Sequence, residues 1–177
     1  FLQSQQAELR VRQHTKLANH LLSLGDCFFV EAMVWPSLTC RAKETEISEK
    51  TGKYKRKKRF GKSIANKAPA TLIRILTQKC SSLGIPGVVK VPLSIKASQY
   101  NHLTNTYEKK SLSQRWNIMP DGRKIQRDLY SAYLLQHVSP QSNQFDVDAL
   151  HRNYEHFVTL HDNVICELSH APKTIAS

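Results

Sequence analysis

The apolar run Cys27–Trp35 constrains the fold most, because it is rich in aromatic and β-branched residues and ends at Pro36. A run of this length and composition predicts a buried β-strand. Residues 5–24, just before it, repeat leucines at helical spacing and stop at Gly25, which predicts an α-helix that the glycine ends. A helix, a Gly-Asp turn and a buried strand in this order indicate an α/β fold built in layers.

The remaining segments extend this pattern. We expect a helix over 69–83, a strand over 88–95 that Pro92 bends or places at an edge, a helix that carries Asp128 to near residue 138, and a last helix over 148–168. Residues 96–121 are polar and irregular. The order supplies too few strands for a complete sheet, and the first residue is Phe1 rather than Met. We therefore expect the chain to be part of a longer protein.

The charge balance indicates the kind of partner. Among 177 residues, Lys and Arg number 26 against 14 acids, which gives a formal charge of +12. Such a balance favours a polyanion as partner, although a soluble protein that is merely basic is the plainer alternative. No stretch approaches the roughly 20 apolar residues of a membrane span. A signal-peptide pattern is also missing, so we expect a cytoplasmic protein that does not bind a membrane.

The four cysteines are far apart and form no CxxC pair. This spacing gives no basis for a zinc ribbon or a redox dithiol, and we expect reduced thiols that are mostly buried. The two tryptophans, Trp35 and Trp116, are predicted to be core or loop anchors rather than platforms on which bases stack. The same holds for Tyr130 and Tyr133, which lie at helical spacing beside leucines.

Two acidic residues are the candidates for chemistry. Glu31 interrupts the apolar strand, where a carboxylate costs free energy unless a metal, a cation or hydrogen bonds compensate. Asp128 lies at a helix start, where free N–H groups favour negative charge. Phosphodiester hydrolysis with two Mg²⁺ ions needs carboxylates that converge from different elements. Each acid also has a plainer interpretation, since Glu31 could pair with a Lys or Arg, and Asp128 with Arg127.

A basic segment lies between the two acids. Residues 51–67 contain no acid, and seven Lys and Arg residues fall within 50–59. Such a run repels itself and predicts a flexible loop. We favour contact with phosphates over a solvated loop, because so little acidic charge lies nearby. The candidate residues here are Lys53, Lys55, Arg56, Lys57, Lys58 and Arg59.

Residues 5–138 resemble the C-terminal half of the transposon-encoded RNA-guided endonucleases, the OrfB-type transposase-associated proteins that are related to type V CRISPR effectors. Three ordered blocks carry the resemblance. The first is Leu24–Glu31 and the second is Phe60–Pro69. The third comprises the pieces Lys96–Tyr100, Leu112–Arg115 and Gln126–Ala132.

This resemblance implies an RNase H-like, RuvC-type nuclease fold over 1–138, without its N-terminal strands and with a C-terminal helical extension over 139–177. It implies a basic loop over 41–67 and a lid-like insertion over 96–122. Glu31 matches the second-motif glutamate of the family and Asp128 the third-motif aspartate, and both bind Mg²⁺ there. The implied partners are DNA and a guide RNA. Further nucleic-acid contacts are expected at Lys62, Lys67, Ser98, Gln99, Arg115 and Arg127.

The chain departs from the family in two places. The first metal-binding aspartate of the family lies on a strand N-terminal to every segment here. Many relatives also carry two CxxC pairs where this chain has 98–121, so no structural zinc is predicted, and Trp116 and Tyr107 are the candidates to hold that loop by packing. We expect part of a Mg²⁺-dependent RNA-guided DNA endonuclease. The alternatives are a nuclease-dead module that occupies guide-matched DNA, and a basic scaffold for RNA. The oligomeric state is left open.

Overall fold

The structure is a computed structural model that describes residues 2–39, 46–49, 51–54, 60–111 and 113–170. It confirms a mixed α/β chain and divides it into two compact units. The first unit consists of Phe1–Phe28 and Ala32–Val89, and the second of Phe29–Glu31 and Lys90–Ser177. Strands β1 (Cys27–Glu31) and β2 (Gly87–Val91) pair with each other, and each contains residues of both units.

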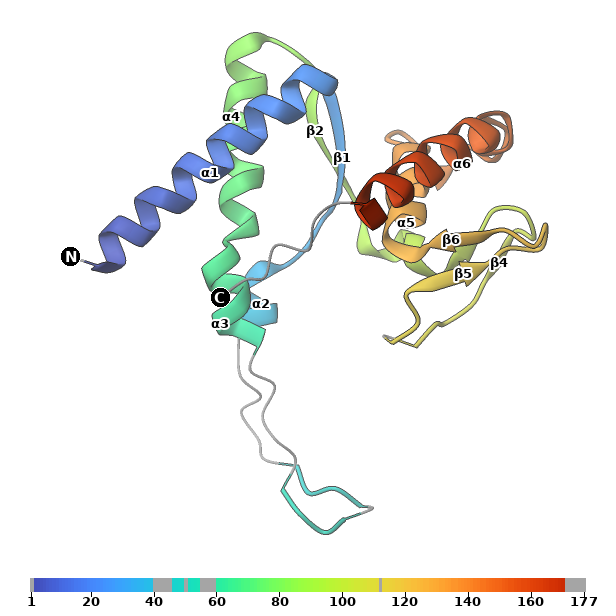
Figure 1. The fold of residues 1–177 in the computed structure, drawn as a ribbon, viewed down its shortest axis with the longest axis horizontal. Coiled ribbons are helices and arrows are strands. Elements are labelled where there is room, and N and C mark those ends of the chain that lie inside the picture. Colours follow the sequence, from blue (N-terminus) through green and yellow to red (C-terminus); the bar gives the residue numbers. More distant parts are fainter. Residues whose placement is uncertain (1, 40–45, 50, 55–59, 112, 171–177) are drawn as a thin grey trace. The chain divides into compact units, whose positions relative to one another are not determined.

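The first unit is built from helices (Figure 1). It contains α1 (Leu2–Leu24), α2 (Trp35–Thr39), α3 (Phe60–Lys67) and α4 (Pro69–Leu83). Helices α1 and α4 pack together around buried Ala18, Ile75, Leu76 and Cys80. The predicted helix over 69–83 is confirmed, because Pro69 occupies its first turn and Gly84 caps its end at a φ of 67°.

Two sequence predictions for the first unit need correction. The predicted strand over Cys27–Trp35 ends at Glu31, and Trp35 and Pro36 begin α2 instead. Proline is tolerated there because a backbone N–H in the first helical turn has no partner within the helix. The basic segment, expected to be a loop as far as residue 67, forms helix α3 over its last eight residues. The guanidinium of Arg10 on α1 donates to the carbonyl of Ala65 (3.1 Å) and so ties α3 to α1.

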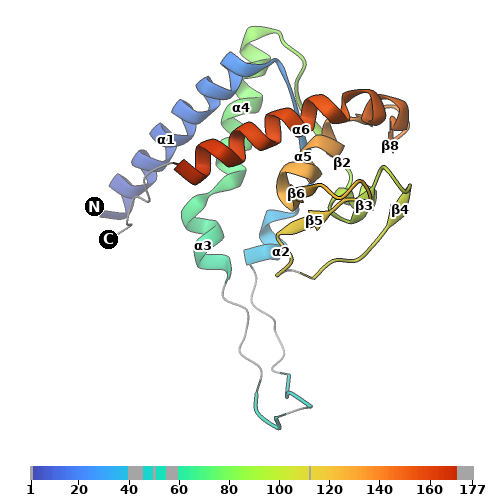
Figure 2. The ribbon, with the colours of Figure 1, turned by 45° about the vertical axis from the view of Figure 1, so that its right-hand side comes forward.

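The second unit alternates short hairpins with helices (Figure 2). The strand predicted over 88–95 ends at Val91, because Pro92 cannot donate to a ladder and a 3₁₀-helix follows. Three antiparallel hairpins then form, β3 with β4, β5 with β6 and β7 with β8. The elements are η1 (Leu93–Ile95), η2 (Ala97–Gln99), β3 (Tyr100–Asn101), β4 (Thr106–Tyr107), β5 (Trp116–Ile118), β6 (Lys124–Gln126), α5 (Arg127–Gln136), β7 (Val138–Ser139), β8 (Gln144–Phe145) and α6 (Val147–His170).

Aromatic residues of α5 and α6 form the core of the second unit. Tyr130 and Tyr133 on α5 are buried, as predicted, and pack in one cluster with Leu150 and Tyr154 on α6. Helix α6, which was predicted to be part of an extension after residue 138, therefore belongs to the same core as α5. The predicted division between 1–138 and 139–177 does not coincide with the two compact units.

The segment over 96–121 is more ordered than its composition indicated. It supplies Ala97, Tyr100 and Met119 to the core cluster and forms β3, β4 and β5. Tyr107 packs its ring against Tyr100, with 4.9 Å between the centroids. Trp116 contacts His161 edge-on, with 6.3 Å between the ring centroids. Both candidates for holding this segment by packing thus contact other rings.

The cysteine prediction is correct only in part. Of the cysteines that the structure describes, Cys80 is buried, whereas Cys27 and Cys166 are exposed.

Among the helices of the described residues, none is long and apolar enough to cross a membrane. The described strands pair only in twos. The α/β class is therefore established, and the RNase H-like assignment remains a proposal.

Candidate functional site

Asp128 lies in the first turn of α5, directly after strand β6. The side chain of Gln126 caps this helix, since its Oε1 accepts a hydrogen bond from the N–H of Leu129 at 2.7 Å. A negative charge at Asp128 is favoured there by the remaining free N–H groups and the helix dipole. The local sequence therefore places an acid at the helix start without strain or burial.

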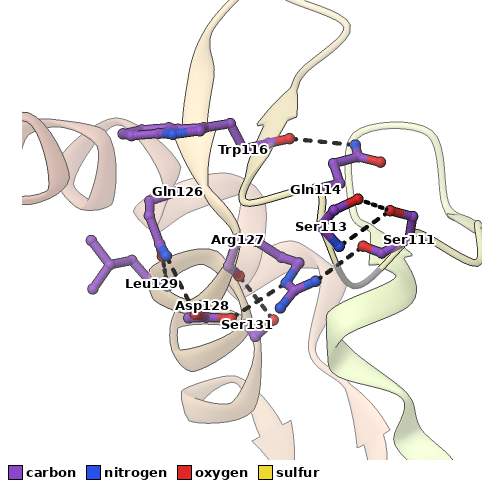
Figure 3. A network of polar contacts seen from close by, with 9 residues as sticks. All are labelled: Ser111, Ser113, Gln114, Trp116, Gln126, Arg127, Asp128, Leu129 and Ser131. Atoms are coloured by element: carbon purple, nitrogen blue, oxygen red, sulfur yellow. Dashed lines mark hydrogen bonds and ion pairs between the residues drawn. The ribbon is translucent and has the colours of Figure 1, made fainter.

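The carboxylate of Asp128 has two close partners (Figure 3). Arg127 Nε lies 3.3 Å from its Oδ1, and Gln126 Nε2 donates to its Oδ2 at 3.4 Å. The Asp128 side chain is 63% exposed, so solvent or a ligand can reach its oxygens. Both contacts are long, and the carboxylate retains lone pairs for a cation or for water.

The guanidinium of Arg127 contacts two parts of the second unit. It contacts Asp128, and its Nη1 donates to the carbonyl of Ser111 at 3.3 Å. The N–H of Arg127 also donates to the carbonyl of Arg115 (2.9 Å), and the side chain is only 14% exposed. Arg127 thus fastens the Ser111–Arg115 segment to the start of α5. The structure shows these internal bonds of Arg127, and the contact of its side chain with a phosphate stays a prediction.

The segment before β5 is folded back on itself. The side chain of Ser111 accepts from the N–H of Ser113 at 3.2 Å, and the amide of Gln114 donates to the carbonyl of Trp116 at 3.3 Å. Arg115, which lies between Gln114 and Trp116 in the chain, is exposed. Figure 3 draws these bonds. The carbonyl of Arg115 accepts a hydrogen bond from the N–H of Arg127, which keeps Arg115 beside the start of α5.

Glu31 is the last residue of β1 and is half-buried. Phe29, two residues earlier, packs against the core cluster of the second unit, which includes residues of α5. Because side chains alternate along a strand, Glu31 projects from the same face as Phe29. Glu31 and Asp128 also belong to the same compact unit. Their convergence on one metal site stays a prediction.

The other predicted contacts fall into three groups. Ser98 is exposed and Gln99 half-buried on η2, which packs against α5. Lys53 and Lys67 are exposed and belong to the first unit, Lys67 at the end of α3. The remaining predictions, Lys55, Arg56, Lys57, Lys58, Arg59 and the side chain of Lys62, lie outside the described residues.

Sequence reasoning missed His161 on α6. This residue is buried, and its Nε2 accepts a hydrogen bond from the N–H of Gln126 at 3.0 Å. Its Nδ1 lies 2.7 Å from the carboxylate of Asp162. The side chain of His161 on α6 therefore holds the junction of β6 and α5. The adjacent His-Asp pair was the only signal in the sequence, and such a pair on a helix is too common to indicate a role.

The two carboxylates have the chemistry that Mg²⁺ prefers in its protein ligands. Carboxylates are the hard oxygen ligands that Mg²⁺ prefers. Within the described ranges, however, no group of three or more His, Cys, Asp or Glu side chains is arranged to hold a metal ion. Binding of Mg²⁺ by Glu31 and Asp128 stays a prediction.

Comparison with known proteins leaves the family undecided. No protein-family model matches the sequence, and no curated protein or solved structure matches it.

Proposed function

We propose that this chain is the C-terminal section of a RuvC-like nuclease domain from a transposon-associated RNA-guided DNA endonuclease. The observation that carries the proposal is the exposed carboxylate of Asp128 at the start of α5, in the same compact unit as the strand end that bears Glu31. Phosphodiester hydrolysis with two metal ions needs carboxylates that come from different elements, and a helix start and a strand end are two such elements.

In this proposal Glu31 and Asp128 share the binding of Mg²⁺, and at least one more carboxylate completes the site. The bound metal would supply charge neutralisation at a scissile phosphate and an activated water. The chain itself contributes the position of Asp128. Gln126 caps the helix and donates to the carboxylate, while Arg127 neutralises it until a metal takes its place.

The charge of the chain supports nucleic-acid partners. A formal charge of +12 favours binding to phosphate backbones in general. If a guide RNA reads the sequence by base pairing, the protein needs to recognise only backbone shape and a short flanking motif. The exposed cations Lys53, Lys67 and Arg115 suit such contacts.

One experiment tests the nuclease and its rival together. The chain is incubated with single-stranded DNA and Mg²⁺, alone and with an added segment that bears a RuvC first-motif aspartate. We expect cleavage only with the added segment, and we expect Asp128→Asn to abolish it. Asp148→Asn is the matched control, because Asp148 also lies in the first turn of a helix, α6. Cleavage that survives Asp128→Asn would contradict the proposal.

The alternative function is a module that binds guide-matched DNA without cutting it. The shortage of metal ligands among the described residues favours this alternative. It predicts binding that persists in EDTA and never leads to cleavage, whatever segment is added. In that case Asp128→Asn would leave the affinity for DNA unchanged.

A further inference from the structure

The hairpin of β5 and β6 has two faces of opposite character. Trp116 pairs with Gln126, Asn117 with Ile125 and Ile118 with Lys124. Asn117 and Ile125 are buried, at 3% and 1% exposure, so the middle pair faces the core. Because side chains alternate along strands, the flanking pairs face the other way. We call this second face, made of Trp116, Ile118, Lys124 and Gln126, the outer face.

The outer face combines an aromatic ring, a cation and an exposed apolar side chain. The ammonium of Lys124 lies 5.0 Å from the centroid of the Trp116 ring, within the range of a cation–π contact. Ile118 is 70% exposed and Trp116 is partly exposed. An indole that carries a cation on its face offers both features that single-stranded nucleic acids require, a stacking surface and a phosphate partner.

The indole is held in place before any ligand arrives. Its ring and that of His161 are nearly perpendicular, at 89° with 6.3 Å between the centroids, and buried His161 accepts a hydrogen bond from the N–H of Gln126. The carbonyl of Trp116 accepts a hydrogen bond from the side-chain amide of Gln114. Figure 3 shows the indole on the same side of the hairpin as the side chain of Gln126. A ring fixed in this way loses little conformational entropy when a base stacks on it.

We propose that the outer face binds single-stranded DNA, with one base stacked on Trp116 and the neighbouring phosphate held by Lys124. Charge complementarity favours this partner, since the chain carries +12 and Arg115, next to Trp116, is an exposed cation. Gln126, which pairs with Trp116, donates to the Asp128 carboxylate at 3.4 Å. The stacked base therefore lies beside the helix start proposed to bind metal. The inference rests on the proposed function only in requiring that the chain binds DNA.

Fluorescence of Trp116 tests the stacking directly. The chain has two tryptophans, and Trp35→Phe leaves Trp116 as the sole indole. We expect a thymidine oligonucleotide to quench this emission with the same midpoint as the binding curve from anisotropy. We also expect Trp116→Ala to weaken binding about tenfold, as loss of one stacked base does, and Trp116→Phe to keep most of the affinity. Binding with unchanged Trp116 emission would overturn the inference.

Controls separate this inference from the proposed nuclease. Tyr107→Ala removes another exposed aromatic side chain of the same unit, on β4, and should leave the affinity unchanged. Lys124→Glu should weaken binding and make its salt dependence shallower by about one phosphate contact. Quenching without any cleavage, even with the first-motif segment added, would keep the outer face and overturn the nuclease, whereas cleavage with that segment but without quenching would do the reverse. Quenching by duplex but not by single strands would also overturn the inference.

Discussion

Single buried polar residues set the chemical character of the second unit. His102 is 1% exposed, and its N–H donates to the hydroxyl of Tyr130 at 3.2 Å, while its Nδ1 lies 2.6 Å from the same oxygen. Burial and the nearby His151 lower the pKa of His102 to about 4, against a smaller opposite effect of Asp121. Burial also raises the pKa of Tyr133 to about 12. The core therefore holds its histidine neutral near pH 7.

This burial predicts how stability changes with pH. The unfolded chain protonates His102 near 6.5 and the folded chain only near 4, so stability is full above 6.5 and falls as the pH drops towards 4. The loss amounts to about 3 kcal/mol at most. Urea unfolding at pH 7, 5.5 and 4.5 should show this decline in the wild type and a weaker one in His102→Asn. Equal declines in both proteins would contradict the prediction, and exposed His20→Asn is the control.

At the scale of elements, helix α6 supports the site rather than extending from it. Its residues Leu150 and Tyr154 complete the core around α5, and its His161 accepts the N–H of Gln126 where β6 becomes α5. The groove between α5 and α6 has a volume of about 500 Å³ and is lined mainly by apolar side chains and by His137, His156 and His161. The position of Asp128 thus depends on a helix more than 30 residues further along the chain.

Removing His161 should loosen the start of α5. His161→Ala leaves the N–H of Gln126 without its acceptor, and an unmade buried hydrogen bond costs about 1–3 kcal/mol. We expect the free energy of unfolding to fall by that amount, and protection of the Gln126 amide from hydrogen exchange to fall with it. Asp162→Asn should be nearly neutral, because an amide oxygen can still accept from Nδ1. His156→Ala, on an exposed position of α6, is the control. An unchanged Gln126 amide in His161→Ala would contradict this account.

At the scale of the whole molecule, the net charge favours polyanionic partners. A formal charge of +12 with few acids near the basic segment makes electrostatics the main contribution to binding of any nucleic acid. Binding to single strands releases about 0.7 counterion per phosphate neutralised.

Affinity for single-stranded DNA should therefore fall steeply with salt. With about five phosphates contacted, the logarithm of the association constant should fall by about 3.5 for each tenfold rise in salt. Anisotropy titrations between 50 and 300 mM salt, with chloride and glutamate compared, measure this slope. An affinity that is indifferent to ionic strength would show that the basic residues serve another purpose.

The sequence determined the parts of the fold that depend on neighbouring residues. The helix over 69–83 was predicted to its ends because Pro69 and Gly84 act within one turn. The burial of Tyr130 and Tyr133 followed from spacing along a single helix. The net charge follows from composition alone. The place of Asp128 at a helix start follows from the local order of residues.

Contacts between residues far apart in the chain depend on how the elements pack. Spacing could not show that His161 would hold Gln126, that Arg127 would fasten the Ser111–Arg115 segment, or that the hairpin of β5 and β6 would turn Trp116 outwards. Nor could it show that the apolar run would end its strand at Glu31. The physical reason is that periodicity and capping act over a few residues, whereas hydrogen bonds across the core depend on how whole elements pack.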